Sequence, residues 1–160
     1  MKSLNVCLGI FIALAVTRFI PHPPNFTSLI ALSFYVPALF GVRYLPIVIV
    51  SFALTDVVLG FHSIILFTWG SVLFVGLLSN FFNRSIIFRI TGALTGVMVF
   101  YLITNFGVWS GGMYGYSFDG LIMSYIMGLP FLGNNIIATF IFSALIESFY
   151  KFYKTKVKNI

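Results

Sequence analysis

The side chains best suited to chemistry are two histidines and one aspartate at the ends of apolar segments. His22 and His62 are the two histidines of the chain, and Asp56 lies near the end of the apolar segment before His62. Imidazole and carboxylate groups bind transition-metal ions, so these three residues are candidate metal ligands. They are scattered over two connections without a tight spacing, however, and a structural ion pair with Arg18 is the first interpretation of Asp56, ahead of a contact with substrate.

Motifs for enzymatic catalysis are nearly absent. Ser110 lies in a glycine-rich segment, but a serine nucleophile needs a general base within reach, and both histidines belong to other segments. The sequence also lacks a glycine-rich phosphate loop. We therefore expect a protein that is not an enzyme and needs no cofactor. The alternative is a metal-dependent membrane enzyme that uses His22, Asp56 and His62.

The composition indicates which elements hold these residues. Of the 160 residues, 60% are hydrophobic and only 8% are charged, whereas a soluble domain carries roughly 25% charged residues to cover its surface. The expected fold class is all-α, a single integral membrane bundle of six transmembrane helices over residues 1–160. Because a crossing takes about 17 to 25 apolar residues, we draw the spans at residues 4–20, 27–42, 44–60, 64–82, 86–104 and 133–152.

The basic residues predict the orientation of the bundle. Nine basic residues against three acidic ones give a net charge of +6. With six spans, Lys2, Arg43, the arginines at 84 and 89, and the lysines of residues 151–158 share one side, and only Arg18 lies on the other. Basic connections mark the cytoplasmic side, so both termini are predicted to lie in the cytoplasm, with the protein in the cell (inner) membrane. Nucleic acid is not an expected partner, because no basic stripe carries interleaved aromatic residues.

This orientation brings most polar side chains to the outer ends of the spans. A polar group at membrane depth is unfavourable unless it faces protein, water or a ligand, so we expect an outward-facing pocket. Residues 105–132 are predicted to form a long outer connection, in which residues 119–129 form a short surface helix. The candidate substrate-binding residues are His22, Asn25, Asp56, His62, Asn105 and Trp109.

Small and polar residues at helical spacing predict how the helices pack. Gly92 and Gly96 form a G-x-x-x-G pair, a pattern that permits close helix contact in lipid. The sixth span carries a polar stripe with a period of four: Asn135, Thr139, Ser143 and Glu147. Glu147 precedes Lys151 by four residues, so we expect an ion pair between them at the helix end.

Four sequence blocks carry a resemblance to a known group of proteins. They are residues 18–26 (Arg-Phe-Ile-Pro-His-Pro-Pro-Asn-Phe), 56–62 (Asp-Val-Val-Leu-Gly-Phe-His), 104–109 (Thr-Asn-Phe-Gly-Val-Trp) and 129–131 (Leu-Pro-Phe). These blocks resemble those of an uncharacterised family of small bacterial membrane proteins. That family is in turn similar, in size, helix number and layout, to the substrate-binding S-components of energy-coupling factor (ECF) transporters.

The resemblance implies a transport function. S-components capture a vitamin-like molecule or a metal ion near the outer face, under loops that include the one after the first helix. They dock through small residues of that helix, here Gly9 and Ala13, to a transmembrane coupling protein driven by a pair of ATPases. The resemblance therefore implies a substrate-binding membrane subunit for uptake. A structural or assembly subunit without a ligand is the remaining alternative.

Overall fold

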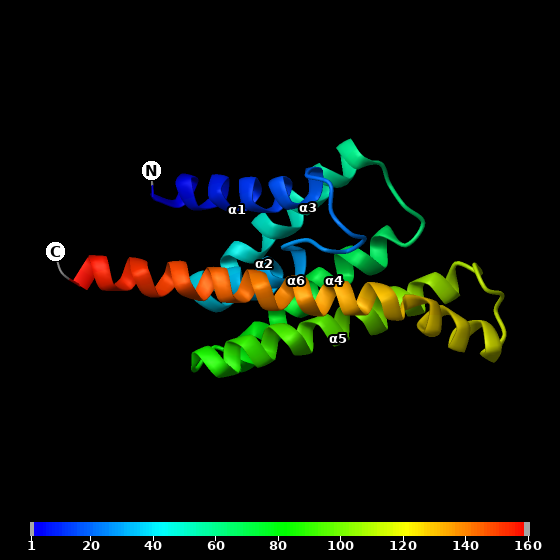
Figure 1. The fold of residues 1–160 in the computed structure, drawn as a ribbon. Helices are drawn as coiled ribbons and strands as arrows, with labels where there is room; N and C mark the ends of the chain where they lie inside the picture. The colour runs from blue at the N-terminus through cyan, green and yellow to red at the C-terminus, as the bar shows by residue number, and fades with distance from the viewer. Residues whose placement is uncertain (1, 159–160) are drawn as a thin grey trace.

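The structure, a computed structural model, describes residues 2–158, and six α-helices make up most of that range. They are α1 (Lys2–Phe19), α2 (Leu29–Phe40), α3 (Leu45–Leu59), α4 (Ile65–Leu78), α5 (Ile86–Ser110) and α6 (Phe118–Lys158) (Figure 1). Two short 3₁₀ turns, η1 (Val42–Tyr44) and η2 (Ser79–Phe81), follow α2 and α4. No strand occurs within residues 2–158. The predicted all-α class is confirmed.

The connections gather at the two ends of the bundle. Figure 1 shows the first turns of α1 and the last turns of α6 at one end. The connections at residues 20–28, 60–64 and 111–117 lie toward the other end. We call that end the loop end. Successive helices therefore run in alternating directions, as the sequence predicts for a chain that turns back after each span.

The surface of the helices is apolar. Three segments are long and apolar enough to cross a membrane, namely Val42–Leu59, Ile86–Ser110 and Phe118–Thr155. Leu4–Phe19, Leu29–Phe40 and Ile65–Phe81 are shorter apolar helices. Large side chains such as Leu66, Phe74 and Ile87 are exposed on the outside of the bundle. A continuous apolar surface of this kind is suited to lipid rather than to water, so these features indicate a membrane protein.

The sixth helix differs from its predicted bounds. The predicted span begins at residue 133, whereas α6 begins at Phe118 and runs without interruption to Lys158. Because α5 also extends to Ser110, the predicted outer connection of residues 105–132 shrinks to residues 111–117. Pro130 lies inside α6, and a proline is tolerated within a membrane helix when neighbouring groups satisfy the freed carbonyl. Figure 1 shows the first turns of α6 inclined to the rest of the helix.

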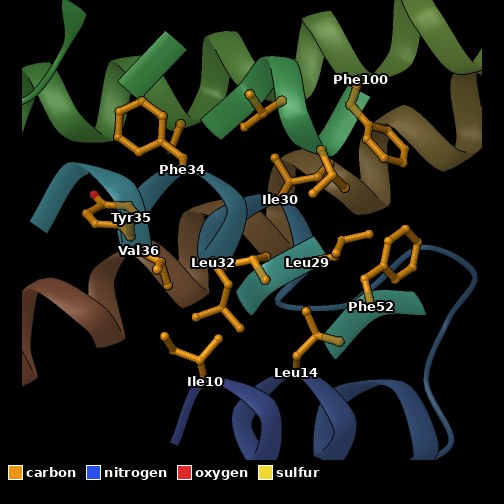
Figure 2. Packing of buried hydrophobic residues seen from close by; sticks show 14 of the residues in the cluster. Ile10, Leu14, Leu29, Ile30, Leu32, Phe34, Tyr35, Val36, Phe52 and Phe100 are labelled. Atoms are coloured by element: carbon orange, nitrogen blue, oxygen red, sulfur yellow. The ribbon is translucent and has the colours of Figure 1, made fainter. Parts of the chain in front are cut away.

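The helix α2 forms the centre of the bundle. Its residues from Leu29 to Pro37 are all buried. Figure 2 shows side chains of this helix, Ile30 and Leu32 among them, between Ile10 and Leu14 of α1 on one side and Phe100 of α5 on the other. A short helix buried on every face positions the other five around it, since each must cover part of its surface.

The G-x-x-x-G pair of α5 brings neighbouring side chains close to the helix backbone. A Cβ atom added at Gly92 would lie 2.6 Å from Cζ of Phe34, and one added at Gly96 would lie 2.9 Å from Cγ1 of Val75. Both distances are shorter than real contacts of a Cβ atom. The predicted role of the pair in helix packing is therefore confirmed, and its partners are α2 and α4 of the same chain.

Candidate functional site

An ion pair joins α1 to α3 near the loop end. Nη2 of Arg18 lies 2.7 Å from Oδ1 of Asp56, and the indole Nε1 of Trp69 on α4 donates to Oδ2 of Asp56 over 2.8 Å. Arg18 also donates to the hydroxyl of Thr55 and to the carbonyl of Phe52. Asp56 is fully buried. The arrangement neutralises both charges. Asp56 is therefore the partner of Arg18 in a structural ion pair rather than a free carboxylate available to a metal ion.

A polar cavity of about 350 Å³ lies directly beside this ion pair. Arg18 forms part of its wall. The α1–α2 connection, the α3–α4 connection, α4 and α6 supply the other polar groups, which are His22, Asn25, Thr27, His62, Thr68 and Asn135. Apolar side chains, Phe52 and Phe100 among them, complete the lining. Amide, imidazole and hydroxyl groups thus meet in one space at the loop end.

A second cavity of about 420 Å³ adjoins the first. The two share five lining residues, which are Asn25, His62, Thr68, Phe100 and Asn135. The second extends between α5 and α6 and reaches Asn105, Tyr101 and Ser124. We call the two together the loop-end cavity. Since a small-molecule site takes about 300 to 1,000 Å³, each part is large enough for a small ligand.

The α1–α2 connection is held against α6 by specific contacts. The side-chain amide of Asn134 donates to the carbonyl of Pro24 over 2.9 Å, and the rings of Phe26 and Phe142 lie 6.5 Å apart. Asn25 adopts a left-handed backbone conformation with φ of 63°, which asparagine adopts more readily than most residues. This backbone turn directs the connection over the cavity, so that His22 and Asn25 both reach its lining.

The structure brings together four of the six candidate substrate-binding residues. His22, Asn25, His62 and Asn105 line the loop-end cavity, whereas Asp56 and Trp109 do not. Asp56 lies beneath the lining and is held by Arg18. These four residues come from the α1–α2 connection, the α3–α4 connection and α5, so the cavity unites parts of the chain that are far apart in sequence.

Trp109 has a different role from the one expected. Its Nε1 donates to the carbonyl of Ser117 over 3.1 Å, and its ring packs against Phe106 with centroids 5.3 Å apart. The indole therefore closes the short α5–α6 connection. The sequence placed Trp109 in the long outer connection of residues 105–132 near the pocket, and the error follows from the predicted length of that connection.

The proposed metal ligands do not form a metal site. Within the described part of the chain, no group of three or more histidine, cysteine or acidic side chains is arranged to hold a metal ion. Asp56 has Arg18 and Trp69 as its partners, while Nδ1 of His22 lies 2.7 Å from the carbonyl oxygen of Pro23. Among the described residues, the candidates His22, Asp56 and His62 are thus not arranged around a common point, and the one carboxylate of the set is paired with Arg18.

Two further residues of the lining were not among the candidates. Asn135 is buried and lines both parts of the cavity, and the buried Thr68 approaches Nε2 of His62 with its hydroxyl at 3.4 Å. Asn135 could have been included from the sequence, because an amide at membrane depth needs a polar partner. Thr68 carries no such signal, since a helical threonine can donate to its own backbone, as this one does to Ile65.

A second ion pair lies toward the opposite end of the bundle. Nε and Nη2 of Arg89 on α5 bind Oε1 and Oε2 of Glu147 on α6 at 2.6 and 2.7 Å. The expected pair of Glu147 with Lys151 is thus not formed. Glu147 faces the interface with α5 and is buried, whereas Lys151 is exposed. A two-point contact with a guanidinium is also stronger and more specific than a single lysine contact.

The predicted docking residues Gly9 and Ala13 line an apolar groove of about 340 Å³ between α1, α2 and α6. Both are exposed, and a Cβ atom added at Gly9 would meet nothing within 4 Å. The small residues therefore leave open space on the surface of the bundle.

Comparison with known proteins gives one match. The model of a family described as a family of unknown function (DUF6580) matches residues 1–160. No curated protein and no solved structure matches the chain.

Proposed function

The chain belongs to the family of unknown function DUF6580, and from its geometry we propose that it is a membrane transport protein that captures a small ligand at the outer face. One observation carries the proposal: a cavity whose wall includes amide, imidazole and hydroxyl groups lies at the loop end of an otherwise apolar bundle. In a membrane protein, polar groups are kept at such depth where they face water or a ligand. The protein would act as the substrate-binding subunit for uptake.

The proposed orientation has six crossings, with both termini in the cytoplasm and the protein in the cell (inner) membrane. The alternating helix directions and the basic residues support it. The lysines of the last turns of α6 lie at the end opposite the loop end, and basic residues favour the cytoplasmic side. The loop-end cavity then opens to the outside.

The lining favours an uncharged or weakly charged organic ligand of vitamin-like size. The charge of Arg18 is neutralised by Asp56, and the remaining polar groups are amides, hydroxyls and imidazoles. Such groups form directed hydrogen bonds, while Phe52 and Phe100 offer apolar surface to a ring or an alkyl chain. A metal ion is not proposed as the ligand, because residues 2–158 hold no assembled set of metal-ligating side chains.

We further propose that the groove at Gly9 and Ala13 receives a helix of a transmembrane coupling protein served by a pair of ATPases. The sequence has no phosphate loop of its own, so ATP would be hydrolysed elsewhere. The likeness to ECF S-components is a prediction from size, helix number and layout. It is supported by the open, apolar character of this groove, since helices in lipid associate where small residues allow close approach.

Mass spectrometry of small molecules extracted from the purified protein tests the proposal. We expect a compound that is enriched with the wild type and lost from Asn135→Ala and His62→Ala, which remove polar groups shared by both parts of the cavity. Asn25→Gly is a useful third variant, because glycine keeps the left-handed backbone while removing the amide. Ser148→Ala, an exposed position on α6, is the matched control.

The outcomes separate this proposal from its alternatives. If no compound is enriched, or if the same compound stays with every variant, the cavity is not the binding site. A ligand-free structural or assembly subunit would then account better for the protein. Turnover of the bound compound by the purified protein would instead favour a membrane enzyme.

A further inference from the structure

A line of polar side chains continues from the loop-end cavity into the bundle. Asn135 lines the cavity, and Thr139, Ser143 and Glu147 follow it along one face of α6. All four are buried. The line ends at the pair that Glu147 forms with Arg89. The interior of α6 thus connects the cavity with an ion pair at the other end of the bundle.

Three hydroxyl groups along this line lack a hydrogen-bond partner. They are Oγ1 of Thr139, Oγ of Ser143 and Oη of Tyr35, and each of these residues is only 1% exposed. Tyr35 comes from α2, and its hydroxyl is close enough to Ser143 and Glu147 to interact with both, although it forms no hydrogen bond of ordinary geometry. A buried hydroxyl without a hydrogen-bond partner destabilises the folded state, so three along one line indicate an additional hydrogen-bonding molecule between the helices.

Other hydroxyls of the same helix are satisfied. Ser124 donates to the carbonyl three residues earlier over 2.7 Å, and Ser148 donates to the carbonyl four residues earlier over 2.7 Å. This local bond is common for serine and threonine within helices. Thr139 and Ser143 do not form it. Their hydroxyls are therefore available to a molecule between the helices, and that of Ser143 also lies close to the hydroxyl of Tyr35.

We propose that Asn135, Thr139, Ser143, Tyr35 and Glu147 bind a file of water molecules that extends the cavity to the Arg89–Glu147 pair. Successive residues of the α6 line are four apart, which corresponds to a rise of about 6 Å. One water molecule with two hydrogen bonds of about 2.8 Å spans such a gap. Buried water binds in this way to polar groups that would otherwise be unsatisfied.

Such a file gives protons a route from the cavity to Glu147. Each water accepts a proton from its neighbour on the cavity side and passes another proton onward. The last proton binds a carboxylate oxygen of Glu147, which then loses the hydrogen bond from Arg89 at that oxygen. Glu147 also lines a groove with Lys151 and Lys154, and the proton leaves Glu147 through this groove to the solution at the end with the termini, so that the carboxylate and its bond from Arg89 are restored. No charged residue lies between Asn135 and Glu147 on α6, so a metal cation would find no counter-charge along the way. The inference depends on the cavity being open to solution and does not depend on which ligand it binds.

Radiolytic hydroxyl-radical labelling in lipid nanodiscs tests for the water, because the radicals form from water molecules in place. The internal comparison is between Tyr35 and its neighbour Phe34. Phe34 is as buried as Tyr35 but packs against Gly92 of α5 rather than against the polar line. Relative to the unfolded chain, we expect Tyr35 to be labelled several-fold faster than Phe34. Equal protection of the two rings in the wild type overturns the proposal and requires no variant.

Variants then identify what holds the water. The double variant Thr139→Val, Ser143→Ala is expected to lose the excess labelling of Tyr35, whereas Ser148→Ala keeps it. Unchanged labelling in the double variant means that the polar line does not bind the water.

For the proton route, influx is measured with a pH-sensitive dye inside proteoliposomes under an imposed membrane potential. We expect faster influx with the wild type than with the double variant, and equal rates exclude the route.

Discussion

At the scale of single residues, the Arg18–Asp56 pair decides how charge is accommodated beside the cavity. The two charges lie 2.7 Å apart, with side-chain exposures of 15% and 1%. Removing one partner of such a pair leaves the other charge uncompensated in a poorly hydrated site. We therefore expect Asp56→Asn to destabilise the protein by roughly 3–5 kcal/mol, measured as a lower midpoint of thermal unfolding in a fixed detergent.

A double variant tests whether the unpaired charge, rather than the altered side-chain shape, causes this loss of stability. In the double variant Arg18→Met, Asp56→Asn, the charge is removed from both partners, and the asparagine still accepts a hydrogen bond from Trp69. Since a buried pair can often be replaced by uncharged groups at little cost, we expect this variant to recover most of the stability. A double variant as unstable as Asp56→Asn alone would show that the ion pair is not the cause.

The sequence predicts at which end of the bundle a site residue lies, but it does not predict which residue of another helix it contacts. His22, Asn25, His62 and Asn105 were correctly grouped at one end, because each lies near a predicted helix end on the same side. The partner of Glu147 could not be found in this way. Spacing along one helix favours Lys151, whereas the partner Arg89 is 58 residues away, and its position depends on how α5 and α6 pack.

At the scale of elements, the glycines of α5 determine how closely α2 and α4 approach. We expect Gly92→Ala to destabilise the bundle by about 1–3 kcal/mol, the range for overpacking a filled core, since its new Cβ would clash with Phe34 and Phe82. Gly70→Ala on α4 is the matched control, because a Cβ there meets nothing within 4 Å. The same thermal-unfolding measurement compares them. Equal midpoints for the two variants would contradict the packing role of Gly92.

The elements themselves were predictable where hydrophobicity alone defines them. The first four helices have both ends within four residues of the predicted spans, and α5 begins at the predicted residue but ends six residues later. The start of α6 was not predictable, because Pro130 and the glycine-rich segment before it are typical helix boundaries in soluble proteins. In this chain the turn is made by the short segment before Phe118, in which Gly112 and Gly115 have φ of 75° and 80°. Pro130 is accommodated within the helix.

At the scale of the whole molecule, the account depends on the cavity opening to the outer face. The apolar exterior, the alternating helices and the basic residues at the end with the termini are consistent with that orientation. The proposed capture of a ligand from outside follows from it, whereas the groove at Gly9 and the polar line of α6 are present in either orientation. If the bundle were inverted, the same cavity would face the cytoplasm and capture from outside would be impossible.

Labelling of single cysteines in intact cells with a membrane-impermeant maleimide tests this orientation most directly. In a Cys7→Ser background, Ser63→Cys places a thiol on the exposed wall of the cavity, and Asn83→Cys places one in the exposed α4–α5 connection at the opposite end. We expect Ser63→Cys to be labelled in intact cells and Asn83→Cys only after the cells are opened. Labelling of Asn83→Cys but not of Ser63→Cys in intact cells would contradict the account.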